Sequence, residues 1–245
     1  MKLTVIGTGL IGSRVIRKLT TAGHQVVPAS LHTGVDLLTG KGLDEALKNA
    51  EVAVNLSNSP TFDAASLDFF RTTTTNLLAA GQRAGVRHQV ILSIVGVDQL
   101  PALDYYRAKA LQEELLRKGP TPYSIVRATQ FFEFMNSFVS WVSDDKTVRL
   151  PSAHVQPIAA DDVVDAVVDV ATGAPLQGIR NVAGPDVFAL DEFGRLTLAA
   201  HHDARTVVVD DKAGMFGGVR GEVLTAGPDA RIARTHYQDW LQSAH

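Results

Sequence analysis

The sequence predicts an α/β protein in which a parallel sheet is covered by helices on both faces. Short apolar runs alternate with helical patterns through the first half of the chain, and the strands read as near-continuous Val, Ile and Leu, as in a buried parallel sheet. The strands are expected at residues 3–6, 25–29, 52–56, 90–93 and 123–126. The helices between them are expected at residues 10–21, 43–49, 64–84 and 105–118. Gly23, Gly85 and Gly119 follow three of these helices, where a C-terminal glycine belongs.

Composition limits the classes of protein to which the chain can belong. Its 245 residues are 45% hydrophobic and 20% charged, which suits a soluble globular protein with a sizeable core. The net charge of −3 lacks the basic excess of a general nucleic-acid binder, and the absence of cysteine excludes thiol chemistry. No apolar run approaches the roughly 18 residues that a membrane span needs. We expect a cytoplasmic protein with no membrane or nucleic-acid partner and without a signal peptide, since glycines interrupt the first apolar stretch.

The second half of the chain has a looser pattern. Helices are expected at residues 161–172 and 190–201, while prolines punctuate the loops between them. Neither a linker nor a repeat separates this part from the first. We therefore predict one domain over residues 1–245, in which residues 128–245 contribute a substrate-side cap. Ligands of open parallel sheets bind beyond the carboxyl ends of the strands, where such a cap would supply substrate contacts.

A glycine-rich turn joins the first expected strand to the first helix. The residues of this G-x-G-x-x-G turn are Gly7, Thr8, Gly9, Leu10, Ile11 and Gly12. The first glycine permits a tight turn, the second lets backbone approach a pyrophosphate, and the third lets helix and strand pack closely. The helix N-terminus offers free N–H groups to the phosphates. The alternative is an ordinary glycine-rich strand–helix turn, but this setting favours a dinucleotide site.

The end of the second strand bears on the choice of nicotinamide cofactor. NAD sites carry an acidic residue there for the ribose 2′-hydroxyl, and residues 26–33 contain none. Ser30 and His32 are suited to bind a 2′-phosphate, with Arg14 nearby, so we favour NADP(H) over NAD(H). The alternative is that these residues form a polar loop and a solvated helix position. Asp36 is a candidate acceptor for an adenine amino group or, equally, a turn residue.

Three polar residues further along fit carbonyl reduction. Ser93 ends a strand, and Tyr105 and Lys109 share a helix face because they lie four residues apart. An ammonium near a tyrosine favours the phenolate, which helps the phenol exchange protons near neutrality. Lysine also suits the nicotinamide ribose, and a serine hydroxyl suits the oxygen where negative charge develops. Tyr106, three residues before the lysine, is an alternative to Tyr105.

The chain resembles the short-chain dehydrogenase/reductase superfamily, and within it the atypical, NmrA-like branch of NAD(P)-binding proteins. The segments that carry the resemblance are residues 5–12, 76–80, 84–88, 92–96, 105–109, 125–132, 156–158 and 161–163. The resemblance implies a Rossmann-like, doubly wound sheet, a dinucleotide site at the glycine turn, and Ser93, Tyr105 and Lys109 as the catalytic set. The branch usually has G-x-x-G-x-x-G, one residue longer than this turn, and often an Arg after the second strand, where this chain has Ser30 and His32.

Other residues complete the predicted site. Asn55 and Ser57, at the end of the third expected strand, should border the adenosine side of the cofactor. Phe131 and Phe132 could form an apolar lid over a substrate, or simply the core of the cap. His154 lies on a loop that could reach the same substrate. We expect no metal, because the adjacent His201 and His202 diverge on a helix without a third ligand.

Two functions from different classes fit these residues. The first is an NADP(H)-dependent oxidoreductase that reduces a carbonyl or related unsaturated small molecule by hydride transfer, with tyrosine as proton donor. The second is a non-catalytic NAD(P)-binding redox sensor of the NmrA-like type. The intact set of serine, tyrosine and lysine favours the enzyme, since a sensor has no physical need of it. Helices that flank the sheet pair subunits in this superfamily, so a homodimer is one expectation for the assembly.

Overall fold

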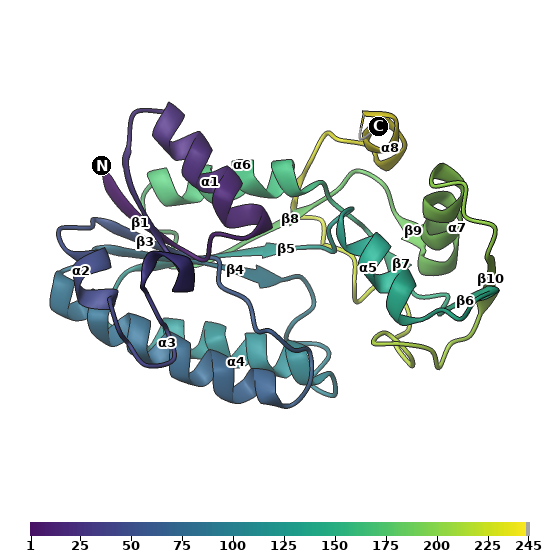
Figure 1. The fold of residues 1–245 in the computed structure, drawn as a ribbon, viewed down its shortest axis with the longest axis horizontal. Coiled ribbons are helices and arrows are strands. Elements are labelled where there is room, and N and C mark those ends of the chain that lie inside the picture. Colours follow the sequence, from purple (N-terminus) through teal and green to yellow (C-terminus); the bar gives the residue numbers. More distant parts are fainter. Residues whose placement is uncertain (244–245) are drawn as a thin grey trace. The chain divides into compact units, whose positions relative to one another are not determined.

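A computed structural model describes residues 1–243 and, at positions 136 and 141, the backbone alone. The main sheet has seven strands: β1 (Lys2–Ile6), β2 (Gln25–Ala29), β3 (Val52–Asn55), β4 (His88–Ile94), β5 (Tyr123–Ala128), β8 (Gly178–Ala183) and β11 (Arg231–Ile232). Their order across the sheet is β11-β8-β5-β4-β3-β1-β2 (Figure 1). From β1 the chain crosses to β2 on one side and then to β3 on the other, so the strand order reverses at β1. Ligands of such folds bind at this reversal, beyond the carboxyl ends of the strands.

The chain divides into two compact units. The first contains residues 1–127 and 163–180, and the second contains residues 128–162 and those from 181 onward. Residues 163–180, expected in the cap, therefore group with the first unit. One domain with a substrate-side cap stays a prediction.

Helices cover both faces of the sheet in the first unit. They are α1 (Leu10–Thr21), α2 (Leu43–Leu47), α3 (Ala65–Ala84), α4 (Asp104–Lys118) and α6 (Ala160–Thr172). Helices α1 and α6 lie on one face, where Lys18 pairs with Asp165, and α3 and α4 lie side by side on the other (Figure 1). The prediction of a doubly wound parallel sheet is confirmed. The five strands and the α1 helix lie within two or three residues of their expected bounds.

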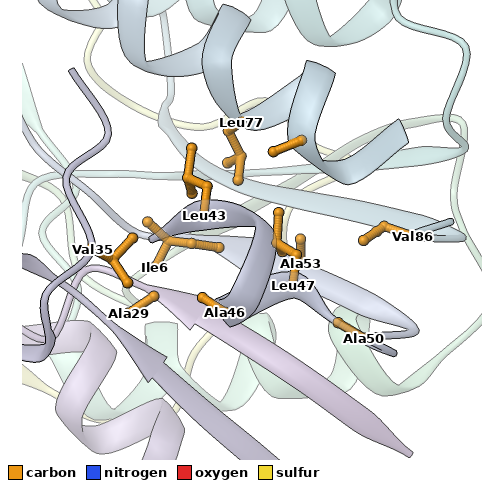
Figure 2. Close-up of a cluster of buried hydrophobic side chains, with 11 residues drawn as sticks. Ile6, Ala29, Val35, Leu43, Ala46, Leu47, Ala50, Ala53, Leu77 and Val86 are labelled. Carbon is orange, nitrogen blue, oxygen red and sulfur yellow. The ribbon is translucent and has the colours of Figure 1, made fainter. Parts of the chain in front are cut away.

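The apolar spacing of these elements explains the core of the first unit. Residues Ile11, Val15 and Leu19 recur every four positions on α1 and are buried. On the opposite face, side chains from β1, β2 and β3 meet those of α2 and α3 in a hydrophobic cluster (Figure 2). Its buried members are Ile6, Ala29, Val35, Leu43, Ala46, Leu47, Ala50, Ala53, Leu77, Ala80 and Val86. This cluster holds the strands whose carboxyl ends carry the candidate site.

The second unit is built from shorter elements. Its strands and helices are β6 (Thr147–Leu150), β7 (His154–Val155), β9 (Phe188–Ala189), β10 (Thr206–Val209), α5 (Phe134–Trp141), α7 (Leu190–Ala200) and α8 (Tyr237–Ser243). Strands β6 and β10 pair in parallel, and β7 and β9 pair antiparallel. Aromatic rings join these pieces, because Tyr237 lies 4.9 Å from Phe132 and 4.5 Å from Phe193 between ring centroids.

Candidate functional site

The glycine turn follows β1 and leads into α1. Gly7 has a φ of +90°, which favours glycine, and a Cβ there would lie 2.8 Å from the Leu56 carbonyl carbon. A Cβ on Gly12 would lie only 1.8 Å from the Gly7 carbonyl oxygen, so α1 can approach the turn only with glycine at that position. Nothing lies within 4 Å of a Cβ built on Gly9. Gly7 and Gly12 thus allow close backbone packing within the turn, and Gly9 leaves the backbone accessible to a ligand.

The N-terminus of α1 supplies the electrostatics of the turn. Gly9 is the N-cap, no side chain caps the helix, and no acidic residue lies in its first turn. The first N–H groups of a helix have no partner within it, and they carry the positive end of its dipole. Thr8 is half-buried before the helix, Leu10 is exposed and Ile11 is buried. The turn has the geometry and the charge that a pyrophosphate requires.

Buried polar atoms without partners lie at the carboxyl ends of the next strands. Ser30 directly follows β2, Asn55 ends β3 and Ser93 is the penultimate residue of β4. The Ser30 Oγ, the Asn55 Nδ2 and the Ser93 Oγ are each buried without a hydrogen-bond partner among the described residues. Buried polar groups are nearly always paired. Because all three lie at the strand edge that carries the glycine turn, they have the character of groups that a bound ligand completes.

The segment after β2 contains the residues predicted to select NADP(H). The Ser30 backbone N–H donates to the Thr33 Oγ1 (2.8 Å), while its own hydroxyl stays unpaired. His32 is exposed and Arg14 is half-buried on α1. The described strand end carries no acidic side chain, the group that NAD sites use for the ribose 2′-hydroxyl.

Asp36 serves the loop itself. Its carboxylate accepts hydrogen bonds from the Leu38 N–H and the Thr39 hydroxyl, both at 2.9 Å. The Thr39 hydroxyl, and after it the Leu38 N–H, hold the pKa of Asp36 below its ordinary value. These hydrogen bonds are those of a turn residue, and adenine binding by Asp36 stays a prediction.

Asn55 and Ser57 form a small polar pair after β3. The Asn55 Oδ1 accepts hydrogen bonds from the Ser57 backbone N–H (3.0 Å) and the Ser57 hydroxyl (2.6 Å). This arrangement fixes the amide so that its Nδ2 faces away from Ser57 and remains a buried, unpaired donor. The pair lies next to Gly7, since a Cβ on that glycine would lie 2.8 Å from the Ser57 nitrogen.

Tyr105 lies near the start of α4 and is held by the loop after β3. Its hydroxyl donates to the Asn58 Oδ1, and its ring lies 4.8 Å from Phe62 and 6.0 Å from Phe70 between centroids. Burial raises the pKa of the Tyr105 phenol, and the hydrogen bond to Asn58 opposes that change. Tyr106, the alternative, is buried and only 2% exposed. Nothing in the sequence pattern pointed to Asn58, which sits in an irregular loop.

Lys109 is enclosed by groups from three elements. The Nζ donates to the Leu92 carbonyl oxygen (2.7 Å) on β4 and to the Gln112 Oε1 on α4, and it lies 4.7 Å from the centroid of the Phe70 ring on α3. The residue is 4% exposed. Burial lowers the pKa of Lys109 to about 7, and the nearby Glu113 carboxylate acts in the opposite direction. The phenol of Tyr105 and this ammonium thus have different hydrogen-bond partners, although both lie on α4.

A buried ion pair supports the same helix. Arg127, at the end of β5, donates to both carboxylate oxygens of Glu113, at 2.8 and 2.7 Å. Arg117 donates to the same carboxylate at 2.5 Å, and Asp98 accepts from Arg127 at 3.2 Å. None of the predicted site residues belongs to this network. The signal for it was a glutamate at a helix position that faces the sheet.

The predicted substrate residues all belong to the second unit. Phe131 is half-buried and forms a bridge with Ile158, and His154 is exposed on β7. Phe132 is 1% exposed and packs against Tyr237, with Trp240 at 5.5 Å. The structure places Phe132 in the core of the second unit, the alternative that the sequence left beside substrate contact.

Residues 1–243 contain neither a candidate metal-binding cluster nor a candidate membrane-spanning helix. No group of three or more His, Asp or Glu side chains that could hold a metal ion occurs among them. In the same range, every helix is too short or too polar to traverse a bilayer.

The sequence is similar to those of known NAD(P)H-binding proteins. The sequence profile of the NAD(P)H-binding family matches residues 7–173. A protein of Streptomyces griseus, named (4-alkanoyl-5-oxo-2,5-dihydrofuran-3-yl)methyl phosphate reductase, is 28% identical over 211 residues, 78% of this chain and 71% of that protein.

Solved structures show the same fold. One is a short-chain dehydrogenase/reductase superfamily protein from Agrobacterium tumefaciens with bound NAD (TM-score 0.71, 16% identity, 100% of this chain and 96% of that chain). Another is dTDP-4-dehydrorhamnose reductase from Bacillus anthracis in complex with NADP (TM-score 0.67, 14% identity, 96% of this chain and 90% of that chain). These likenesses confirm the Rossmann-like architecture.

Proposed function

Because the chain belongs to the NAD(P)H-binding family, we propose that it is an NADP(H)-dependent reductase of a carbonyl or related unsaturated small molecule. One observation carries the proposal: Ser30, Asn55 and Ser93 hold buried, unpaired polar atoms beside an open glycine turn. Each such group costs about 1–3 kcal/mol when left without a partner. A dinucleotide and a small polar substrate would supply the missing partners.

The residues around the turn fit a dinucleotide in order. The backbone of residues 7–12 and the α1 N-terminus would hold the pyrophosphate. Ser30, His32 and Arg14 would bind a ribose 2′-phosphate, and Asn55 with Ser57 would border the adenosine. The reduced nicotinamide, when bound, supplies a hydride.

The catalytic roles rest on three side chains. The Ser93 hydroxyl would donate to the substrate oxygen as negative charge develops there. Tyr105 would give that oxygen a proton, and its raised pKa keeps the phenol protonated at neutral pH. Lys109 would bind the nicotinamide ribose and, through its positive charge, lower the pKa of the Tyr105 phenol. Release of the Tyr105 hydroxyl from Asn58 is part of this proposal, because that hydroxyl now donates to the amide.

Neighbouring tyrosines give a matched test of the proton donor. We expect Tyr105→Phe to lower kcat by about 10²–10⁴-fold, the range typical of general acids. Tyr106→Phe, one residue along the same helix, should stay within a few-fold of the parent protein. Both are measured by NADPH oxidation with a panel of carbonyls and unsaturated lactones. The panel includes an alkanoyl-oxo-dihydrofuran, the type of compound in the name of the S. griseus relative. A Tyr105→Phe protein with parental kcat would refute the assignment.

Calorimetric titration of the purified protein tests the cofactor. We expect NADPH to bind at least about ten-fold more tightly than NADH, because His32 and Arg14 offer positive or polar groups to the extra phosphate. The double variant His32→Ala/Arg14→Ala should weaken NADPH and leave NADH nearly unchanged. Equal affinity for both cofactors would remove the preference for NADP(H) and leave the glycine turn as the site.

The Asn58 contact favours a second candidate, a cofactor-binding redox sensor. A phenol that donates to Asn58 and is covered by Phe62 is engaged by the protein itself. The sensor would be favoured if the protein bound NADPH tightly but turned over no compound of the panel, and if Asn58→Ala, which frees the phenol, also showed no turnover. Turnover that responds to Tyr105→Phe would exclude it.

A further inference from the structure

We propose that Gln112 is a positioning residue for Lys109, whose ammonium it holds in place together with the Leu92 carbonyl. This inference rests on the proposed function, in which Lys109 serves the cofactor and the phenol. The evidence for it is geometric. The Lys109 Nζ donates to the Leu92 oxygen at 2.7 Å and to the Gln112 Oε1, and the Gln112 side chain is completely buried.

The orientation of the Gln112 amide is set by its hydrogen bond to Lys109. Its Oε1 accepts from the ammonium, which leaves its Nε2 a buried donor without a partner among the described residues. Turning the amide over would put the NH₂ group against the ammonium, where both are donors. The unpaired Nε2 is therefore the consequence of keeping an acceptor on Lys109.

The identity of the residue also matters, because glutamate would supply an acceptor as well. A carboxylate beside the ammonium would favour the charged form strongly, whereas an amide adds a hydrogen bond without a charge. The Glu113 carboxylate, one residue further on α4, is shared with Arg127 and Arg117. Helix α3 presents the Phe70 ring, and β4 presents the Leu92 carbonyl, and neither group titrates. Gln112 thus fixes the position of Lys109 and leaves it able to titrate near neutral pH, where burial places its pKa.

The experiment follows Lys109 in the ligand-free protein, so that it does not depend on turnover. Lysine labelled with ¹³C at Cε gives one NMR resonance per residue, and the Lys109 resonance is the one missing from Lys109→Met. Its chemical shift is followed against pH in the parent protein and in Gln112→Glu, Gln112→Leu and Gln112→Asn. The control is Gln89→Leu, since Gln89 is also buried with an unpaired Nε2, but that atom lies close to Gly81.

The substitutions should move the titration midpoint in opposite directions. Gln112→Glu should raise it by about one pH unit or more, because an opposite charge stabilises the ammonium. Gln112→Leu removes the acceptor of the charged form, and Gln112→Asn draws it back by one methylene, so both should lower the midpoint. Gln89→Leu should leave it unchanged. If either direction is seen in a folded variant while the control stays at the parental midpoint, the proposal stands.

Midpoints within about 0.2 pH units of the parent in every folded Gln112 variant would overturn it. The result is independent of the proposed function, which is tested by cofactor titration and by Tyr105→Phe. A protein that showed the Gln112 effect but bound no NADPH would retain the positioning role and lose the reductase. A protein that turned over substrate but showed no Gln112 effect would retain the reductase and lose the positioning role.

Discussion

The two units achieve burial by different means. In the first, aliphatic side chains from parallel strands meet helices (Figure 2). Three of its buried, unpaired polar atoms, on Ser30, Asn55 and Ser93, lie at strand ends. In the second, the pieces are short and meet through aromatic rings from distant segments, such as Phe132, Phe193 and Tyr237. The comparison teaches that the candidate cofactor site rests on the regular unit, and that the second unit depends on a few large side chains.

The comparison is tested most strongly by one truncation in each unit. Phe193→Ala should destabilise the protein by about 3–5 kcal/mol, because its ring is 2% exposed and packs against both Tyr237 and Phe188. Leu77→Ala, in the hydrophobic cluster of the first unit, should cost about 2–5 kcal/mol. Urea unfolding followed by tryptophan fluorescence and by far-ultraviolet circular dichroism gives both values.

The same pair distinguishes the units functionally. At a urea concentration where both variants remain folded, Phe193→Ala should retain NADPH affinity, since the proposed cofactor residues belong to the first unit. Loss of NADPH binding in Phe193→Ala, with parental binding in Leu77→Ala, would contradict this assignment.

The buried ion pair has an expected effect of similar size. Arg127→Met should cost about 3–5 kcal/mol, because it leaves the Glu113 carboxylate, 1% exposed, with Arg117 as its remaining cation. The double variant Arg127→Met/Glu113→Met should recover much of that loss, since two apolar side chains replace two buried charges. A double variant less stable than Arg127→Met would show that Glu113 has a separate structural role.

The difference between the units also explains what the sequence could predict. Strands such as β1 and helices such as α1 follow from apolar spacing, and the roles of Gly7 and Gly12 follow from the motif. The aromatic cluster could not be foreseen, because Phe132, Phe193 and Tyr237 are brought together by tertiary packing and not by any local period. Asn58 was missed for the same reason, since it contacts Tyr105 from an irregular loop. Gln112 lies only three residues from Lys109 on α4, but spacing alone does not show which side chain accepts from the ammonium.

The site residues illustrate the same limit at smaller scale. Spacing places Tyr105 and Lys109 on one helix face, and that much the sequence can state. Which atoms they contact depends on Asn58, Leu92 and Gln112, and a four-residue spacing does not specify these partners. The number of buried unpaired atoms at the strand ends likewise emerges only from the packed structure.

The smallest expected effect concerns the first unit and appears only in acid. His88, at the start of β4, is 3% exposed, and its Nε2 lies 2.8 Å from the Ser124 Oγ, which also accepts from the Leu176 N–H. Burial lowers the pKa of His88 below its ordinary value of 6.5. The unfolded chain therefore binds this proton more readily than the folded protein.

It follows that the contribution of His88 is fully present above pH 6.5 and is lost as the pH falls through the lower, folded pKa. The parent protein should lose free energy of unfolding over that interval, and His88→Gln should lose less, because it has no proton to take up. Urea unfolding at a series of pH values from 7.5 to about 5 compares the two. A matched variant of the exposed His32, His32→Gln, should follow the parent. If His88→Gln and the parent lose stability in parallel, a group other than His88 causes the acid sensitivity.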